Sequence, residues 1–312
     1  MEPLLFTIPP ALSGCTVQHV LEQVFLMSRS HISRLKRREG GILKNGEKCY
    51  STARCQEGDV ITALISDAPG TVTLEPFDIP LDIVCEDEWL IVVNKPTGLT
   101  VHPERSGVGG SVENALAYYF KEGEYCHTVS RLDRGTSGLM TVAKSGYIHE
   151  RMRGILHTHD FVKRYVCISE GRPEKDAGVI RLPLRHVEGS HYMMEPAGEL
   201  ELLPCGSETE PAEAGDCVTA YRLLSYGGGL SMLELTPRTG KMHQLRVHMA
   251  ALGCPLVGDW LYGKESSYID RPALHSQRLT FRHPMTGETV ELEAPVPADM
   301  KKLMRTSISI NN

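Results

Sequence analysis

The amino-acid sequence predicts an α+β protein, in which a small basic N-terminal α/β domain precedes a larger domain. We expect the larger domain to hold a mixed, largely antiparallel sheet with flanking helices and a central cleft. Two hairpin signals, Asn45-Gly46 and Gly227-Gly228-Gly229, stand between strand-like runs, and hairpins join antiparallel strands. Helical and strand periodicities occur in both parts of the chain. Because residues 67–80 carry proline and glycine, we expect a linker there, between domains at 1–66 and 81–312.

The elements of the N-terminal domain follow from capping residues and turn residues. Thr16 is expected to cap a helix whose apolar residues recur at helical spacing through Phe25. Ser30 is expected to cap a second, short helix that ends near Arg38. Residues 42–48 read as a hairpin, and residues 60–65 read as a strand.

The second of these helices lies in a strongly basic stretch. Residues 28–48 hold seven Lys or Arg against two Glu, a local charge of +5 in a chain whose net charge is −6. Such a patch favours binding to nucleic-acid phosphates, although a basic helical hairpin without function would show the same pattern. The expected RNA-binding residues here are Arg29, Arg34, Lys36, Arg37 and Arg38. Residues 197–217 are acidic instead and are expected to form a solvated surface insertion without chemistry.

The elements of the larger domain are predicted in the same way. Ser111 is a helix cap, and Gly253 is expected to end the last helix. The predicted strands are 83–85, 90–93, 139–143, 162–169, 220–226 and 230–236, and the predicted helices follow Ser111, span 145–156 and lie within 238–253.

One acidic residue stands out in the stretch 127–144. Asp133 lies between Arg131 and Arg134, and a guanidinium nearby lowers the pKa of a carboxyl, which keeps it ionised as a base or nucleophile. Gly135 and Gly138 are expected to let the backbone approach a ligand closely. Taken alone, the tetrapeptide would be read as a surface ion pair on an ordinary loop.

Two further stretches carry residues suited to an RNA site. Tyr165 alternates with Val166 along a strand and is expected to face a cleft, where it could stack on a base, although a core tyrosine would fit the same pattern. Arg238 and Lys241 precede a predicted helix, whose free N–H groups favour phosphate. Arg246 lies one turn after His243, and we expect it to reach Asp133.

Composition bounds the class of protein. The chain has 312 residues, of which 41% are hydrophobic and 23% are charged, as in globular proteins. We expect no membrane segment, because Pro9 and Pro10 interrupt the only apolar run near the start. Nine cysteines without a C-x-x-C pair indicate reduced thiols in a cytoplasmic protein. His243 and His248 are five residues apart, which does not fit a helical metal pair, so no metal is expected.

Four stretches together resemble the RluA-type family of RNA pseudouridine synthases. They are Asp87 to Pro103, His127 to Lys144 with Arg131-Leu132-Asp133-Arg134, Lys163-Arg164-Tyr165, and Arg238 to Gly263 with His243-Gln244-Leu245-Arg246. The likeness covers about residues 80 to 300. The N-terminal domain resembles the αL-type RNA-binding module first described in a ribosomal small-subunit protein.

This resemblance implies an isomerase that converts uridine in structured RNA to pseudouridine, as a monomer without a cofactor. It implies that Asp133 is the catalytic aspartate, that Arg246 is its ion-pair partner, and that Tyr165 stacks on the uracil and handles the proton at C5. It also implies that Arg131 and Arg134 support the turn and contact RNA, as Arg238, Lys241 and His243 would. Large-subunit ribosomal RNA is the expected substrate, and tRNA is the alternative.

Two other functions fit parts of the sequence. A glycoside hydrolase also cleaves a glycosidic bond with carboxylates, but it usually needs a second acid, which the stretches around Asp133 and Arg246 do not offer. A non-catalytic RNA-binding or ribosome-assembly factor would keep the basic stretch. Binding alone would not require the set Asp133, Tyr165 and Arg246, and this set therefore favours the enzyme.

Overall fold

The computed structural model describes residues 1–67, 74–104, 110–120, 126–156, 158–207 and 215–309. The chain divides into two compact units, of which the first comprises Met1–Val92, Glu113–Ser130 and Thr141–Gly154, and the second Val93–Val112, Arg131–Met140 and Ile155–Asn312. The expected domain boundaries at 66 and 80 stay a prediction. Residues 68–73 of the expected linker lie outside the described residues.

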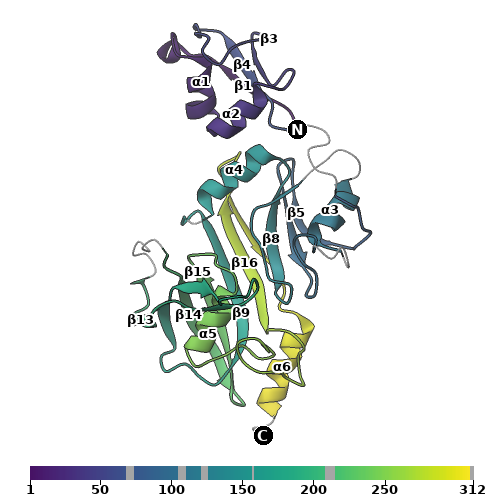
Figure 1. Ribbon diagram of the computed structural model, residues 1–312, viewed down its shortest axis with the longest axis vertical. Helices are drawn as coiled ribbons and strands as arrows, with labels where there is room; N and C mark the ends of the chain where they lie inside the picture. Colours follow the sequence, from purple (N-terminus) through teal and green to yellow (C-terminus); the bar gives the residue numbers. More distant parts are fainter. Residues whose placement is uncertain (68–73, 105–109, 121–125, 157, 208–214, 310–312) are drawn as a thin grey trace. The chain divides into compact units, whose positions relative to one another are not determined.

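The first unit carries the N-terminal elements together with helices α3 and α4 (Figure 1). Its helices are the 3-10 helix η1 (Pro10–Leu12), α1 (Val17–His19), the π-helix η2 (Val20–Val24), α2 (Arg29–Leu35), α3 (Val112–Phe120) and α4 (Gly146–Ile155). Its strands are β1 (Leu4–Thr7), β2 (Ile42–Lys44), β3 (Glu47–Lys48), β4 (Val60–Ala63), β5 (Asp82–Glu86), β7 (His127–Thr128) and parts of β6 (Leu90–Lys95) and β8 (Ser137–Ala143).

The N-terminal strands form a four-stranded sheet in the order β1-β4-β2-β3. Asn45 and Gly46 both have positive φ, 52° and 81°, as a tight two-residue hairpin turn requires, and they confirm the predicted hairpin. Strand β1 was not predicted, because its four residues are too few to show a period. It gains its place by pairing with β4 along its whole length.

Of the two helix caps predicted in the N-terminal domain, the one at Thr16 is confirmed and the one at Ser30 is wrong. Thr16 Oγ1 accepts a hydrogen bond from His19 N at 3.2 Å and caps α1, which continues as a π-helix. The second helix is capped by Ser28 and not by Ser30: Ser28 has extended backbone, and its Oγ accepts from His31 N at 3.1 Å. Ser30 is already the second residue inside the helix, so it cannot hold the N-cap position.

The second unit is built on a sheet with the strand order β13-β10-β14-β15-β9-β16-β8. Pairing is antiparallel except between β16 and β8, which are parallel, so the predicted α+β class with a mixed, largely antiparallel sheet is confirmed. The elements are β9 (Phe161–Glu170), β10 (Ala177–Arg181), β11 (Leu184–His186), β12 (Met194–Pro196), β13 (Glu201–Leu203), β14 (Val218–Gly227), β15 (Leu230–Pro237), α5 (Gln244–Ala251), β16 (Leu274–Arg282), β17 (Thr289–Glu293) and α6 (Ala298–Ser309).

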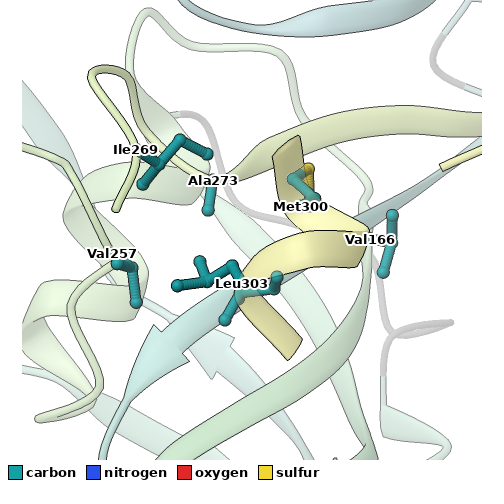
Figure 2. Packing of buried hydrophobic residues seen from close by; sticks show 7 residues of the cluster. Val166, Val257, Ile269, Ala273, Met300 and Leu303 are labelled. Carbon is teal, nitrogen blue, oxygen red and sulfur yellow. The ribbon is translucent and has the colours of Figure 1, made fainter. Parts of the chain in front are cut away.

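Helix α6 covers one face of strand β9 (Figure 2). Met300 and Leu303 of the helix are buried in one apolar cluster with Val166 and Ile168 of the strand. Burial of such side chains contributes roughly 1.5 to 3 kcal/mol each. Because side chains alternate along a strand, Tyr165 must point to the other face, as the sequence pattern predicted. The helix therefore fixes which face of β9 is left for a site.

Part of the acidic stretch 197–217 belongs to the sheet. Strand β13 lies within it and pairs with β10 at the edge, and Glu201 and Asp216 both lie 3.7 Å from Arg181. Residues 197–202 are exposed, as expected for a solvated surface stretch, but the sequence did not predict that it supplies an edge strand and carboxylates for a half-buried arginine. Residues 208–214 of the stretch lie outside the described residues.

Candidate active site around Asp133

Asp133 lies on a turn that immediately precedes β8. Thr136 N donates a hydrogen bond to the Asp133 carbonyl at 3.0 Å and closes the turn. The side chain of Asp133 keeps 30% of its surface exposed, whereas Leu132 and Thr136 on the same turn are buried. The turn therefore holds its backbone inside the protein and leaves the carboxylate accessible to a substrate.

A buried lysine holds the backbone of this turn. The Lys95 side chain has no exposed surface, and its Nζ donates to the carbonyls of Pro96 at 2.9 Å, Leu99 at 2.8 Å and Arg134 at 3.3 Å. Gly98 N also donates to the Arg134 carbonyl at 2.8 Å. Burial lowers the pKa of Lys95 to about 7, against the effect of the nearby Asp133 charge, which raises it.

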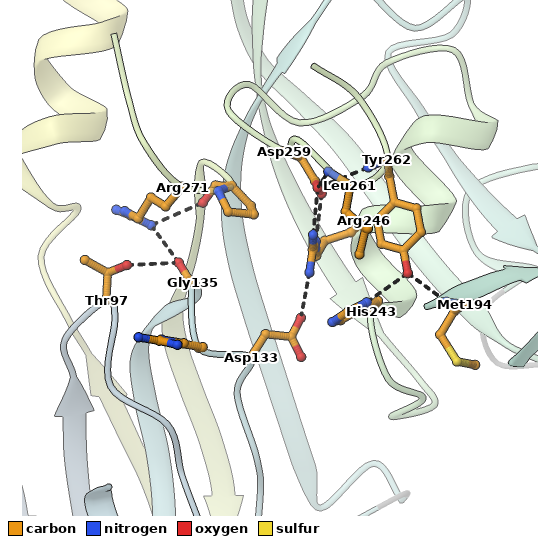
Figure 3. Close-up of polar contacts among 12 residues, drawn as sticks. Thr97, Asp133, Gly135, Met194, His243, Arg246, Asp259, Leu261, Tyr262 and Arg271 are labelled. Carbon is orange, nitrogen blue, oxygen red and sulfur yellow. Dashed lines mark hydrogen bonds and ion pairs between the residues drawn. The ribbon is translucent and has the colours of Figure 1, made fainter. Parts of the chain in front are cut away.

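The carbonyl of Gly135 is a second anchor of the turn (Figure 3). It accepts from Thr97 Oγ1 at 3.3 Å and from Arg271 Nη1 at 3.5 Å. Arg271 is itself buried and held by Asp299 through two hydrogen bonds of 2.7 and 3.0 Å. Lys95, Thr97 and Arg271 thus fix the carbonyl groups of Arg134 and Gly135, the two residues that follow Asp133.

The two glycines after Asp133 pack against protein and not against an open site. A Cβ on Gly138, which has φ +112°, would lie 2.3 Å from the Ser276 carbonyl oxygen. A Cβ on Gly135 would lie 3.0 Å from the Pro272 side chain. The expectation that these glycines face a ligand is therefore wrong. Gly138 is required where β8 and β16 approach each other, a contact that depends on residues far apart in sequence.

Arg246 links Asp133 to a second aspartate (Figure 3). Its Nε and Nη2 each donate to Asp259 at 2.7 Å, in a bidentate pair that is almost fully buried. Its Nη1 lies 4.0 Å from Asp133 Oδ2. The predicted approach of Arg246 to Asp133 is present, but the strong partner of the guanidinium is Asp259.

Asp259 also fixes the charge and orientation of Arg246. Burial opposes the charged guanidinium, but the hydrogen bonds and charge of Asp259, together with the charge of Asp133, outweigh it and raise the pKa of Arg246. Leu261 N and Tyr262 N donate to Asp259 Oδ1 at 3.2 and 3.3 Å and hold this carboxylate in turn. Arg246 therefore presents a permanent positive charge to Asp133 in a fixed place.

His243 starts helix α5 in a strained conformation. Its φ of +54° and ψ of +14° are left-handed, which is uncommon for a residue with a Cβ and costs free energy. Its Nδ1 lies 2.8 Å from Tyr262 Oη, and this oxygen accepts a hydrogen bond from Met194 N at 2.8 Å. Burial lowers the pKa of His243, against the nearby Asp133 charge, which raises it. A neutral His243 that accepts at Nδ1 carries its proton on Nε2.

Tyr165 is buried, with 5% of its surface exposed, and lies across from Ser276 in the β9–β16 pair. Burial strongly raises the pKa of its hydroxyl, the Ser276 side chain lowers it by a hydrogen bond, and the Asp133 charge raises it further. Tyr165 is thus within the electrostatic reach of Asp133, and its hydroxyl keeps its proton over the whole neutral pH range.

The remaining predicted residues lie in different surroundings. Arg131 and Arg134 are exposed, and Arg134 contacts the Gly98 carbonyl at 3.1 Å and Glu104 at 3.5 Å. Among the ion pairs of the described residues, Asp133 therefore pairs with Arg246 and not with its sequence neighbours Arg131 and Arg134. Lys241 is exposed just before α5.

The basic residues of the N-terminal stretch differ in their freedom to bind. Arg29 and Arg34 pair with Glu22 at 3.5 Å and Glu150 at 3.3 Å, respectively. Arg38 is half-buried and donates to the carbonyl and hydroxyl of Ser66. Lys36 and Arg37 are exposed, and within the described part of the chain neither has a carboxylate partner.

Sequence reasoning assigned no role to Asp259, Lys95 or Tyr262. All three belong to stretches that carry the family resemblance, Gly258-Asp259, Asn94-Lys95-Pro96 and Tyr262-Gly263, so a signal was present. Their roles could not be derived, because each depends on a partner brought close by the fold. A Cβ on Gly258 would lie 2.4 Å from the Arg271 carbonyl oxygen, which explains the glycine before Asp259.

Comparison with known proteins now adds to this geometry. A family model described as RNA pseudouridylate synthase matches residues 89–251, a segment that contains Asp133, Tyr165 and Arg246. The chain belongs to the RNA pseudouridylate synthase family. This match confirms the resemblance to the RluA-type synthases and makes the chain an isomerase that acts on uridine in RNA.

Individual relatives agree over most of the chain. The ribosomal large subunit pseudouridine synthase D of Escherichia coli (strain K12) is 34% identical over 281 residues, which are 84% of this chain and 81% of that protein. The uncharacterized RNA pseudouridine synthase YhcT of Bacillus subtilis (strain 168) is 33% identical over 273 residues, 85% of this chain and 84% of that protein.

A solved structure shares the fold. Human RNA pseudouridylate synthase domain containing 4 matches with a TM-score of 0.54 and 27% identity, over 72% of this chain and 93% of that chain. The predicted synthase-type fold is thereby confirmed. Of the helices in the residues that the structure describes, none has the length and apolar character needed to span a bilayer.

Proposed function

We propose that Asp133 is the catalytic carboxylate of this pseudouridine synthase. The observation that carries the proposal is the position of its Oδ2, 4.0 Å from a guanidinium that Asp259 holds bidentately. A positive charge at this distance attracts the carboxylate electrostatically. Asp133 also keeps an accessible side chain on a turn whose backbone is fixed by Lys95 and Arg271.

The reaction assigns a definite task to this carboxylate. The N1–C1′ bond of uridine breaks, the free uracil turns, and a C5–C1′ bond forms, while C5 loses a proton and N1 gains one. Asp133 serves as the nucleophile or base that assists the first bond cleavage. Because that bond is inaccessible in a stacked helix, the nucleotide has to be flipped out for Asp133 to reach it.

Tyr165 and Arg246 serve the same step in different ways. Tyr165, which feels the Asp133 charge, offers a ring face to the uracil and a protonated hydroxyl as a donor. Because its pKa is raised, this hydroxyl cannot remove the C5 proton by itself as a phenolate. Arg246 places a positive charge beside Asp133 and helps to orient its carboxylate.

We infer that the substrate is large-subunit ribosomal RNA. The support is the 34% identity over 81% of the Escherichia coli protein whose name states that substrate. The exposed cations Lys36 and Arg37 supply phosphate contacts outside the site. Arg131, Arg134, Lys241, His243 and Arg238 are further proposed RNA contacts.

The test compares RNA from a strain that lacks the gene with RNA from strains that express wild type, Asp133→Asn or Asp176→Asn. Asp176 is a surface aspartate paired with Arg172 at 3.0 Å and serves as the matched control. Pseudouridines are mapped by carbodiimide treatment and primer extension in ribosomal RNA and tRNA. We expect a large-subunit site that is lost in the deletion, restored by wild type and Asp176→Asn, and not restored by Asp133→Asn.

Purified protein gives a direct readout of the chemistry. RNA labelled with tritium at uridine C5 should release tritium to water with wild-type protein and at least 10⁴-fold more slowly, on the order of catalytic-group removal, with Asp133→Asn. Activity of Asp133→Asn at the wild-type level would assign the chemistry to another residue. A lost site found only in tRNA would overturn the substrate assignment alone.

A further inference from the structure

A polar cavity lies at the start of strand β9. It is small and open to solvent, and it lies between Phe161–Lys163 of β9 and the residues 236–239 at the end of β15. Lys163 and Arg238 are its charged lining residues, and hydroxyls of Thr158, Thr236 and Thr239 add polar atoms. None of the described residues that line it is acidic.

The two cations in this cavity have no carboxylate partner. Neither Lys163 nor Arg238 forms an ion pair with any residue in the described ranges, and both are only partly exposed. The Nε of Arg238 is buried without a hydrogen-bond partner, and its Nη1 donates to His159 Nδ1 at 3.2 Å. Two positive groups brought together without a counter-charge cost free energy, and a bound anion would offset that cost.

The pKa of Lys163 reflects its burial without a carboxylate partner. Burial lowers the pKa of its ammonium to about 8. By contrast, Lys264 pairs with Glu170 at 2.8 Å, and Arg222 pairs with Glu234 at 3.0 Å. Lys163 thus differs from Lys264 and Arg222 in having no carboxylate partner among the described residues.

The cavity lies near Tyr165, the residue proposed to stack on the uracil. Lys163 precedes Tyr165 by two residues on a regular strand, so both side chains leave the same face about 7 Å apart. The pairing of Leu235 with Tyr165 also brings the end of β15, with Arg238 beyond it, to the start of β9. A group bound there is therefore one pleat away from the residue proposed to stack on uracil.

We propose that this cavity is a phosphate-binding subsite, in which Lys163 and Arg238 hold a phosphodiester of the RNA strand next to the flipped uridine. A planar guanidinium fork, an ammonium and hydroxyls are groups that bind phosphate oxygens. The assignment to a phosphodiester rests on the proposed function, whereas the affinity for a phosphate group does not. The subsite fixes the register of the strand, because phosphate contacts position a nucleic acid.

The first experiment measures acetylation of Lys163 by acetic anhydride at pH 8, with peptide mass spectrometry as the readout. The protein is tested alone, with inorganic phosphate, with an RNA stem-loop, and with chloride at equal ionic strength. We expect at least fivefold protection of Lys163 by RNA and none of Lys264. Equal protection by millimolar phosphate would identify a free anion as the ligand source. Equal labelling in all four conditions would overturn the subsite.

The second experiment locates the phosphate in the RNA. Binding is measured in the Asp133→Asn background, so that no chemistry is needed, with stem-loops that carry one neutral methylphosphonate near the target uridine. One linkage should weaken binding about tenfold, and the same linkage should have less than a twofold effect in Lys163→Met or Arg238→Gln. The control variants Lys264→Met and Arg222→Gln should keep the tenfold effect.

These outcomes separate the subsite from the proposed function. If every linkage weakens binding equally in wild type and in Lys163→Met, the subsite is refuted even if Asp133 proves catalytic. If the tritium-release assay fails but Lys163 is still protected by RNA, the proposed chemistry is refuted and the subsite stands. Near-ultraviolet circular dichroism of Lys163→Met and Arg238→Gln checks that both variants are folded.

Discussion

The guanidinium of Arg246 is shared between two carboxylates, those of Asp133 and Asp259. A guanidinium whose only partner was Asp133 could form a short hydrogen bond to that carboxylate and cover the oxygen that we propose to react. Asp259 takes two of its N–H groups at 2.7 Å and leaves Nη1 facing Asp133 at 4.0 Å. The arginine thus supplies charge to Asp133 without a short hydrogen bond that substrate would have to break.

Replacement of the buried partner should be costly. Asp259→Asn leaves the Arg246 charge without its bidentate partner, and we expect a loss of about 3 to 5 kcal/mol in the free energy of unfolding. Urea denaturation measures it. The control is Glu293→Gln, which removes an exposed pair with Arg278 and should change stability by about 1 kcal/mol or less. A change as small in Asp259→Asn would show that the buried pair is dispensable.

Tyr165→Phe separates stacking from hydrogen bonding at the same position. The ring and its contact area stay, and only the hydroxyl that bonds to Ser276 is removed. If the hydroxyl acts in proton transfer, the rate of tritium release at saturating RNA should fall by about 10² or more, while the RNA dissociation constant stays within about twofold. An unchanged rate would make Tyr165 a stacking platform only.

Lys95 makes the stability of the site depend on pH. Its pKa is lowered to about 7 in the folded protein, whereas an unfolded lysine keeps its proton up to about 10.4. Between these values the unfolded chain binds more protons, so folding stability should rise with pH.

The matched comparison is wild type against Lys95→Met. The free-energy difference between the two proteins should shift in favour of wild type by up to about 1.4 kcal/mol per pH unit from pH 7 to 9. Urea denaturation at several pH values measures this slope, and other titrating groups cancel. A pH-independent difference would mean that Lys95 keeps its proton with the three carbonyls.

Among the elements, β8 and β16 place the Asp133 turn on the sheet. They are parallel neighbours paired at His275 with Ser137 and Ser276 with Gly138. Ser276 Oγ donates to the Leu139 carbonyl at 3.0 Å, and Ser137 Oγ lies 2.9 Å from His275 Nδ1. Side-chain hydrogen bonds thus add to the short backbone pairing of β8 and β16. The close approach of these two strands requires a glycine at position 138.

Gly138→Ala tests this contact. The new Cβ would meet the Ser276 carbonyl oxygen at 2.3 Å on backbone with φ +112°, so we expect a loss of about 3 kcal/mol or more in unfolding free energy. Gly154→Ala is the control, because its Cβ in α4 meets nothing within 4 Å and should stabilise by about 0.5 to 1 kcal/mol. Equal stability of the two variants would contradict the packing described.

The elements that could be predicted from the sequence are those with a local signal. The hairpin at Gly227–Gly229, the strand with Tyr165 and helix α5 all follow from turn residues or periodicity. Strand β16 was missed because buried polar residues such as His275 and Ser276 hide its alternation. The cap at Ser28 and the partner of Arg246 were missed because they depend on backbone angle and tertiary contact.

The whole molecule combines a net charge of −6 with cations of very different availability. Most of the basic residues of the stretch 28–48 are engaged within the protein, such as Lys44 with Asp59 at 2.7 Å and Arg38 with Ser66. The local charge of +5 therefore overstates the number of cations that are free to meet RNA. Lys36 and Arg37 keep that ability, because both are exposed without a carboxylate partner in the described residues.

Salt dependence can count these free cations in the full-length protein. Each phosphate neutralised adds about 0.7 to 0.9 to the slope of log affinity against log salt, so Lys36→Gln with Arg37→Gln should lower the slope by about 1.5. The control replaces the ion-paired Lys264 and Arg222 by Gln and should leave the slope unchanged. Affinity is measured by filter binding between 50 and 300 mM KCl, with Asp133→Asn present in every protein. If the first pair leaves the slope unchanged, Lys36 and Arg37 do not contact RNA phosphates.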